Sequence, residues 1–241
     1  MPFAKKPQVF GAKINELTLG TGDKATVLGG QNVFNLYTFD APIANRPKIG
    51  IDVSDDPEQP SEGLKEFYAG CETLADRAKK AAGVAEADFV CIRFDLADPN
   101  GANKSIEDCV ADAKAVAEAI DKPLVVAGCK NSEKDADLFG KISEALQGKN
   151  ILVLSAKEEN YKGVAAGAGL AYGQKVGAES AVDINLAKQL NVLITQMGVD
   201  GKNVAMNVGS AAAGYGFEYV VSTLERVKAA ALSQNDNTLQ M

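Results

Sequence analysis

DFVCIRFD, residues 88–95, is one of six short apolar runs that decide the fold of this chain. The runs are five to eight residues long and rich in Val, Ile, Leu and Ala. Continuous apolar runs of that length are typical of parallel strands buried on both faces. We therefore predict six strands, at IGIDV (49–53), DFVCIRFD (88–95), PLVVAG (123–128), NILVLSA (150–156), KVGAES (175–180) and NVAMNV (203–208).

Helical patterns fill the spaces between these runs, whose first residues are 39, 35, 27, 25 and 28 residues apart. Apolar residues recur at helical spacing from Leu64 to Ala75 and again from Phe217 to Val227, which predicts amphipathic helices. Ser105, three residues before Asp108, and Asp183 are predicted helix N-caps. The alternation of strand and helix predicts successive βα units around a parallel sheet.

The winding of these units decides between an open dinucleotide-binding sheet and a barrel. No GxGxxG follows the first predicted strand, where the carboxylate-rich DVSDDP (52–57) stands instead. We therefore expect an α/β fold, a TIM (β/α)₈ barrel, over residues 47–241. About six βα units fit there, whereas a complete barrel has eight in ~250 residues, so we expect the chain to stop before a seventh strand. Residues 1–46 are expected to form an N-terminal β-hairpin ribbon with GTGDK (20–24) as its turn.

The composition excludes several classes of activity. The chain has 241 residues, with 25 Lys or Arg, 32 Asp or Glu and no His, so its formal net charge is −7. Without an imidazole, no Ser-His-Asp triad, Cys-His pair or His-containing zinc site can come from this chain alone. The acidic balance and the lack of a basic stripe argue against nucleic-acid binding. Neither a membrane segment nor a secretory signal is visible, so we expect a cytoplasmic protein that does not bind membranes.

The four cysteines do not indicate a metal site. Cys71, Cys91, Cys109 and Cys129 lie 20, 18 and 20 residues apart and form no CxxC motif. That spacing signals neither a zinc knuckle nor an iron–sulfur cluster. Buried free thiols are the expected state.

Polar segments follow the predicted strands, at the end of a barrel where ligands bind. Asn103, in a turn before a helix, and Asn160, at a helix start, also admit a purely structural role. The Gly214–Gly216 segment lies between a strand and a helix N-terminus, whose free N–H groups suit a phosphate or amide oxygen. Gly167 and Gly169 are assigned to close helix packing. The candidate ligand-binding residues are Asn103, Asn160, Ser180, Asp183, Gly214, Tyr215 and Gly216.

Four carboxylates near predicted strand ends are candidate acids or bases: Asp52, Asp55, Asp95 and Glu179. Their spacing in sequence identifies no catalytic pair, because separation in space decides that role. A structural role stays open for each of them, and no catalytic residue is assigned.

Longer strings carry a resemblance to a known family. From about Asn45 to its end, the chain resembles the small subunit of the corrinoid iron–sulfur protein, which is also called the delta subunit of acetyl-CoA decarbonylase/synthase. Several multi-residue matches in the same order make this more specific than any single motif. The strings are DFVCIRFDLADPNGANKSIEDC (88–109), EENYKGVAAG (158–167), AVDINLAKQLNVLI (181–194) and GYGFEYVVSTLERVKAAAL (214–232).

The resemblance implies a complete TIM-barrel subunit that pairs with a large subunit carrying a [4Fe-4S] cluster and a corrinoid-binding domain. It implies a corrinoid (cobamide) between that domain and the carboxyl-end face of the barrel, where the candidate residues would contact corrin amides or wall the ring. In such proteins the cobalt receives a methyl group from methyltetrahydrofolate, or a methyltetrahydropterin, through a methyltransferase. The group is then delivered to acetyl-CoA synthase/CO dehydrogenase in the reductive acetyl-CoA (Wood–Ljungdahl) pathway. The chain would be a non-catalytic methyl-carrier subunit whose cofactor supplies the chemistry.

Two functions of other classes stay open on the sequence. A pterin-dependent methyltransferase would bind the folate directly through Asp and Asn at strand ends, for instance Asp95 and Asn207. A scaffold would support the large subunit without touching the cofactor. The fold alone does not separate these functions.

Overall fold

A six-stranded parallel sheet forms the centre of the computed structural model, which describes residues 8–34, 43–58 and 61–241. Each strand pairs with the next one along the chain. All six strands lie within or overlap the predicted apolar runs, so the parallel α/β sheet is confirmed. The strands are β3 (Gly50–Ser54), β4 (Phe89–Arg93), β5 (Leu124–Ala127), β6 (Leu152–Ala156), β7 (Lys175–Glu179) and β8 (Val204–Asn207).

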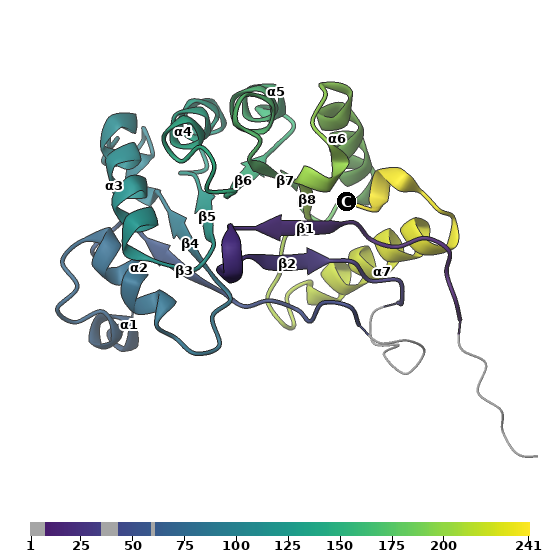
Figure 1. The fold of residues 1–241 in the computed structure, drawn as a ribbon, viewed down its shortest axis with the longest axis horizontal. Helices are drawn as coiled ribbons and strands as arrows, with labels where there is room; N and C mark the ends of the chain where they lie inside the picture. The colour runs from purple at the N-terminus through teal and green to yellow at the C-terminus, as the bar shows by residue number, and fades with distance from the viewer. Residues whose placement is uncertain (1–7, 35–42, 59–60) are drawn as a thin grey trace, which may run out of the picture.

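Helices cover the outer face of this sheet, and Figure 1 shows α3 to α6 side by side along an arc over the strands. In the described ranges, none of the helices combines the length and hydropathy that a bilayer span requires. The helices are α1 (Glu62–Phe67), α2 (Leu74–Ala82), α3 (Ile106–Ala119), α4 (Ser132–Ala145), α5 (Tyr161–Val164), the π-helix η3 (Ala165–Leu170), α6 (Ile184–Gln196) and α7 (Phe217–Ser233). Short 3₁₀ turns are η1 (Gly22–Lys24), η2 (Asp95–Ala97), η4 (Gly201–Asn203) and η5 (Asn237–Leu239).

The strand order distinguishes this sheet from a doubly wound one. The order β3-β4-β5-β6-β7-β8 never reverses, whereas a dinucleotide-binding sheet reverses at its switch point. Consecutive order with helices outside is the winding of a barrel. However, β3 and β8 do not pair with each other among the described residues, so no closed barrel is found and the predicted TIM barrel is not confirmed. Six strands form an open sheet with two free edges.

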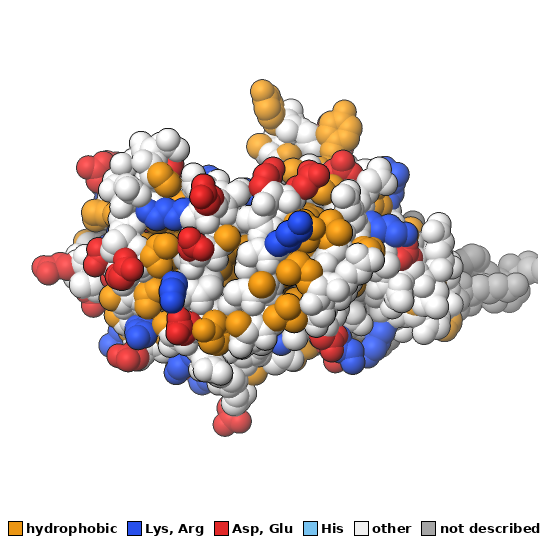
Figure 2. All heavy atoms as spheres, turned by 90° about the horizontal axis from the view of Figure 1, so that it is seen from above, with side chains coloured by type: hydrophobic (Ala, Val, Ile, Leu, Met, Phe, Trp, Pro, Cys, Tyr) orange, Lys and Arg blue, Asp and Glu red, His pale blue; other side chains and the backbone are white. Residues whose placement is uncertain are grey.

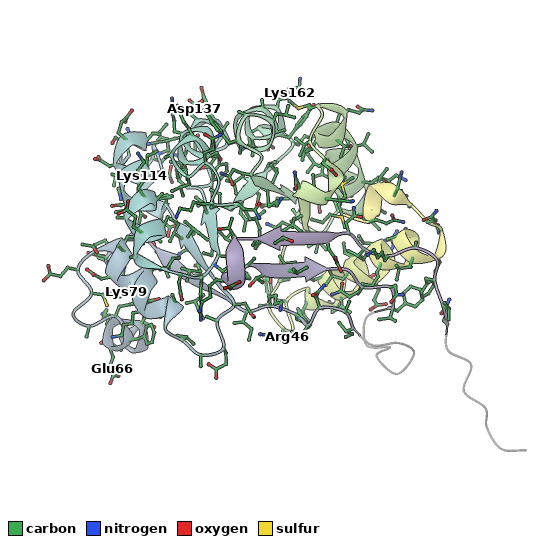
Figure 3. The ribbon with its side chains drawn as sticks, viewed as in Figure 1. Arg46, Glu66, Lys79, Lys114, Asp137 and Lys162 are labelled. Atoms are coloured by element: carbon green, nitrogen blue, oxygen red, sulfur yellow. The ribbon has the colours of Figure 1, made fainter. Side chains whose placement is uncertain are left out.

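The main core lies between the sheet and the helices. Val90, Val126 and Val153 on three neighbouring strands are fully buried, together with Phe139 and Ile142 of α4. Successive strand residues alternate between faces, so the residues on either side of each valine in its strand point to the opposite, inner face. The outer surface of the helical layer carries interspersed acidic and basic side chains (Figure 2), and Lys114, Asp137 and Lys162 lie on the outer sides of α3, α4 and α5 (Figure 3).

An antiparallel ribbon packs against the inner face. Its strands β1 (Glu16–Leu19) and β2 (Thr26–Gly29) flank the turn predicted at residues 20–24. Leu17 and Leu19 contact Val125 and Leu152 of β5 and β6. Asn150, just before β6, donates to the carbonyls of Thr18 and Gly20 at 2.8 and 3.0 Å. The ribbon therefore fills the inner face near the amino ends of the strands; residues 1–7 and 35–42 of the predicted ribbon lie outside the described residues.

The helical pattern predicted from Leu64 to Ala75 is two helices rather than one. Helix α1 ends at Phe67, and Gly70 has a φ of 79°, a left-handed conformation that breaks a helix. Thr73 then starts α2 with a capping box, in which its hydroxyl accepts from the Asp76 N–H and the Asp76 carboxylate accepts from the Thr73 N–H. The periodicity of apolar residues continues across this break and therefore does not reveal it.

Close helix packing explains Gly167, as the sequence predicts. A Cβ on Gly167 would lie 3.3 Å from the Cα of Gly140 in α4, and a Cβ on Gly163 would lie 2.9 Å from the Cβ of Ala136. The small residues thus let α4 and the α5–η3 helix approach closely. Gly169 also packs closely, because its Cβ would lie 2.9 Å from Val199.

Gln174 is a fully buried amide that joins α4 to β6. Its Oε1 accepts from the Ile151 N–H at 2.9 Å, and its Nε2 donates to the Leu146 carbonyl at 3.1 Å. We expect Gln174→Leu to lower the free energy of unfolding by about 1–3 kcal/mol, because the Ile151 N–H would be left buried without a partner, while the Leu146 carbonyl still accepts from the Lys149 N–H at 3.0 Å. Urea denaturation measures this loss. Gln147, just after α4, is exposed, and Gln147→Leu should change the free energy of unfolding by less than about 0.5 kcal/mol. Equal effects of the two substitutions would contradict a role for the buried hydrogen bonds of Gln174.

Candidate functional site

A cavity of about 690 Å³ opens at the carboxyl ends of the strands, on the inner face. The alternation of the strands explains most of its lining, because inward-facing residues near the carboxyl end of each strand point into it. Ser155 joins Leu154 in the lining at an irregularity of β6. The ribbon occupies the other end of the same face, so the cavity has an apolar floor and a polar mouth. Its lining residues are Asp52, Cys91, Arg93, Ala127, Gly128, Lys130, Asp135, Leu154, Ser155, Lys157, Glu179, Asn207 and Ser210.

Arg93 is held rigidly on one wall of the cavity. Its Nε donates to both carboxylate oxygens of Asp95, at 2.8 and 2.7 Å, and its Nη1 pairs with Asp52 on β3. Ser54 donates to Asp95 at 2.6 Å. Burial lowers the pKa of Arg93, but the hydrogen bonds and charges of Asp95 and Asp52 outweigh it, so the pKa is raised above its usual value. The guanidinium is therefore a fixed positive charge that two carboxylates already balance.

Cys91 lies deeper in the cavity as a neutral thiol. Burial, followed by the charge of Asp52, raises the pKa of Cys91 to about 12. A thiol that stays protonated is a poor nucleophile. All four cysteines are free; Cys109 and Cys129 are buried as predicted, whereas Cys71 and Cys91 are only partly so.

Lys157 and Glu179 form a looser pair on the opposite wall. They follow β6 and end β7, and Lys157 Nζ lies 3.7 Å from Glu179 Oε1. Their side chains are 29% and 32% exposed, so both reach the mouth. Beside them, Asn207 Nδ2 donates to Ser155 Oγ at 3.1 Å, and Asn207 Oδ1 accepts from the Gly209 N–H. This wall therefore offers a ligand a positively charged donor, Lys157, and a negatively charged acceptor, Glu179.

A buried carboxylate shapes the loop between β5 and α4. Asp135 accepts from the N–H groups of Cys129 and Lys130 at 2.7 and 3.1 Å and from the Cys129 thiol at 3.2 Å. A Cβ on Gly128 would lie 2.2 Å from Asp135 Oδ1, so only glycine fits there. Burial raises the pKa of Asp135, against the opposing effect of these hydrogen bonds. Asp135 is thus part of the wall and is occupied by its own loop.

A second buried carboxylate braces the strand ends from outside the cavity. Asp55 accepts from the Leu96 N–H at 3.0 Å and pairs with Lys104 at 3.2 Å. Lys104 also pairs with Asp112 of α3 at 2.5 Å. Burial lowers the pKa of Lys104, but the two carboxylates raise it by more, so the pKa of Lys104 lies above its usual value. This network ties the loop after β3 to the loop after β4 and so positions Asp52 and Arg93.

The seven residues predicted to bind ligand do not line the cavity. Asn160 is buried, accepts from the Lys157 N–H at 2.7 Å and donates to the Ser132 carbonyl. Asn103 accepts from Lys134 at 2.7 Å. These two asparagines therefore both contact the start of α4. Their ligand-binding role stays a prediction, beside a structural role that the contacts make explicit.

The other five predicted residues belong to the neighbouring loops after β7 and β8. Asp183 caps α6, as predicted, by accepting from two N–H groups at 2.8 and 3.1 Å. Ser180 directly follows Glu179 and is 1% exposed, and its hydroxyl has no partner among the described residues. Gly214 and Gly216 have φ of 75° and 100°, and Tyr215 between them is 87% exposed. That loop begins at Ser210 on the cavity rim.

The sequence predicts only part of this lining. Asp52 and Glu179 are among the candidate carboxylates and Asn207 belongs to the alternative function, but Arg93, Ser155 and Lys157 are not predicted. The signal that could have found Arg93 is the alternation within its strand, which marks Cys91 and Arg93 as facing the same side. Alternation does not mark Ser155, which lies at an irregularity of β6, or Lys157, which follows that strand. Reading only the loops after the strands shifts the expected site outward by several residues.

Comparison with known proteins assigns the family. The family model described as CO dehydrogenase/acetyl-CoA synthase delta subunit matches residues 16–241. The chain belongs to this family. The resemblance seen in the sequence is therefore confirmed, and the delta-subunit match includes β1 and every later strand and helix of the chain.

Curated delta subunits from methanogens and other archaea are similar over most of the chain. The acetyl-CoA decarbonylase/synthase complex subunit delta of Methanothermobacter thermautotrophicus is 32% identical over 236 residues, 96% of this chain and 60% of that protein. Subunit delta 1 of Methanosarcina thermophila is 30% identical over 219 residues, 90% of this chain and 50% of that protein. Subunit delta of Archaeoglobus fulgidus is 29% identical over 239 residues, with 95% and 53% covered. The chain thus spans 50–60% of the length of these relatives.

Proposed function

We propose that this chain is the delta-type, small subunit of a corrinoid methyl carrier in an acetyl-CoA decarbonylase/synthase system. The carrying observation is the family match over residues 16–241. In this proposal, a large subunit with a [4Fe-4S] cluster and a corrinoid domain docks on the cavity mouth in the cytoplasm. A methyltransferase supplies the methyl group from methyltetrahydrofolate or a methyltetrahydropterin, and acetyl-CoA synthase/CO dehydrogenase takes it up in the reductive acetyl-CoA pathway.

The lining of the cavity fits the periphery of a corrinoid, which carries neutral side-chain amides. Arg93 is balanced by Asp52 and Asp95, and Lys157 faces Glu179, so donors and acceptors are present without an excess of one charge. A neutral, amide-bearing ligand is favoured by such a lining over a phosphate or a dicarboxylate. The bound corrinoid would supply a cobalt centre that carries the methyl group. The residues of this chain would orient the ring and exclude water from its edge.

The open sheet supports a further structural element of this proposal, closure into a TIM barrel. Among the described residues, the edges of β3 and β8 have no further strand, and one side of α7 exposes Phe217, Val221 and Leu224 by 49%, 38% and 43%. The relatives are longer than this chain. We propose that additional βα units of the full-length protein pair with the two edges and cover this side of α7.

Co-purification tests the methyl-carrier function. The full-length protein should be produced with the large subunit from the same organism and purified without oxygen. We expect a stable complex that contains cobalt and has the absorption spectrum of a reduced corrinoid. A separate, colourless delta subunit beside a large subunit that holds all of the corrinoid, with equal methyl transfer when the delta subunit is left out, would overturn the proposal.

The alternative function, a pterin-dependent methyltransferase, has one supporting observation. Asn207 lies in the cavity lining, as direct folate binding would require. Asp95, the other residue expected for that role, has its carboxylate engaged by Arg93 and Ser54. Calorimetric titration of the chain alone with methyltetrahydrofolate separates the two functions, because a binding isotherm without the large subunit would favour the enzyme.

A further inference from the structure

We infer that Lys157 and Glu179 form a clamp for one primary carboxamide of the ligand that enters the cavity mouth. This inference rests on the proposed function, in which that ligand is a corrinoid with primary carboxamides at the ends of its side chains. It assigns the contact to two residues of this chain that lie on adjacent strand ends.

The clamp is a part of the lining that is free to accept a ligand. Arg93 is engaged by two carboxylates, and Asp135 accepts three hydrogen bonds from its own loop. Asn207 uses both ends of its amide. In the part of the chain that the structure describes, the Lys157 ammonium and the Glu179 carboxylate form no side-chain hydrogen bond, and their 3.7 Å pair is their one ion pair. That distance is beyond hydrogen-bond range, so opening the pair costs little. The charge of Lys157 also acts on Asp135, whose pKa it lowers.

A primary carboxamide matches this pair chemically. Its carbonyl oxygen would accept from the Lys157 ammonium, and its N–H would donate to the Glu179 carboxylate. Both hydrogen bonds would be charge-assisted, which makes them stronger than bonds between neutral groups. A carboxylate in the same place would be repelled by Glu179, and an ammonium would be repelled by Lys157. The pair therefore selects the amide over its hydrolysed form.

The backbone beneath the clamp is fixed, so the two side chains are presented at a defined spacing. Asn160 accepts from the Lys157 N–H at 2.7 Å and is itself tied to Ser132. Glu179 ends β7, where it is paired in register with Asn207 of β8. This gives Asn160 a positioning role one step away from the ligand.

Chemical labelling tests the contact directly. We would prepare the complex without a corrinoid, treat it with an amine-reactive N-hydroxysuccinimide ester, with and without added dicyanocobinamide, and quantify each lysine by mass spectrometry. Lys157 should be protected roughly 10-fold by the corrinoid. Lys141, which forms a similar ion pair with Glu144 at 3.2 Å on the outer side of α4, should react equally in both samples.

Substitutions give the clamp a specific signature. Lys157→Met and Glu179→Gln should each weaken binding of dicyanocobinamide by roughly 10-fold, whereas the matched outer variants Lys141→Met and Glu144→Gln should bind as the unmodified complex does. The isomeric monocarboxylic acids of cobinamide each have one hydrolysed amide. One isomer should bind the unmodified complex roughly 10-fold more weakly than cobinamide, and Glu179→Gln should remove that difference, because a glutamine amide can donate to the carboxylate.

The outcomes separate the clamp from the proposed function. If the unmodified complex retains no corrinoid, both the function and the clamp fail. The clamp is wrong and the function stands if the complex retains corrinoid but the Lys157 and Glu179 variants bind it as the matched outer variants do. The same holds if the cobinamide acid isomers keep their order of affinity in Glu179→Gln. Thermal unfolding of each variant, followed by circular dichroism, shows whether a loss of binding reflects a loss of fold, and the isomer ranking at Glu179 does not depend on stability.

Discussion

Asp55→Ala should lower the free energy of unfolding by about 3–5 kcal/mol, the largest loss that we expect from a single substitution in this chain. The side chain of Asp55 is fully buried and holds both the Lys104 ammonium and the Leu96 N–H. Its removal leaves a partly buried ammonium with one carboxylate fewer and a backbone N–H without its acceptor. Urea denaturation followed by circular dichroism measures the loss.

Two comparisons make the Asp55 result interpretable. Asp112→Ala removes the other partner of Lys104. The Asp112 side chain is 38% exposed, so this substitution should lower the free energy of unfolding by less than about 1 kcal/mol. Asp55→Asn keeps the shape and one acceptor, so its loss should fall between the two and leave folded protein to study if Asp55→Ala does not fold. Equal losses for Asp55→Ala and Asp112→Ala would show that burial does not set the strength of this network.

Leu19→Ala should lower the free energy of unfolding by about 2–5 kcal/mol. Leu19 is fully buried in the small core that joins the ribbon to Val125 and Leu152 of the sheet. The substitution removes buried apolar surface and leaves a cavity where the ribbon closes the inner face. The same denaturation experiment measures the change.

Thr18→Ala is the matched control on the same strand. Thr18 is exposed and points to the other side of the ribbon, while the carbonyl that Asn150 contacts belongs to the backbone and is retained. Its effect should stay within about 0.5 kcal/mol. A loss for Leu19→Ala no larger than that of Thr18→Ala would mean that the ribbon is attached through its backbone hydrogen bonds and not through its leucines.

Local patterns predict the parallel strands because burial on both faces leaves a continuous apolar signature. Val90 and Ile92 face the helices while Cys91 faces the inner side, and all three are apolar enough to make one run. The caps at Ser105 and Asp183 are equally local, since each contacts N–H groups two or three residues ahead. The break at Gly70 is a single-residue event inside a continuing periodicity, so the pattern predicts one helix across it.

The candidate site is less visible in the sequence because it depends on which side chains meet. Asn160 reads as a ligand-binding or capping residue, and only its contacts with Lys157 and Ser132 show that it anchors a loop. Lys157 and Glu179 are 22 positions apart, and their proximity follows from the register of β6 and β7. Register and barrel closure are long-range properties, and the sequence pattern constrains them through strand order alone.

The ribbon joins parts of the chain that are synthesised at different times. The Asn150 side chain bonds to Thr18 and Gly20, 132 and 130 residues earlier. Each parallel strand after β3 pairs with the one made just before it, whereas the β1 leucines pack on Val125 and Leu152 of the much later β5 and β6. At about 5–20 residues per second, Leu17 and Leu19 wait roughly 7–26 s for their partners during translation. Leu17 and Leu19 are thus made well before the strands that bury them, and they are available to chaperones throughout that interval.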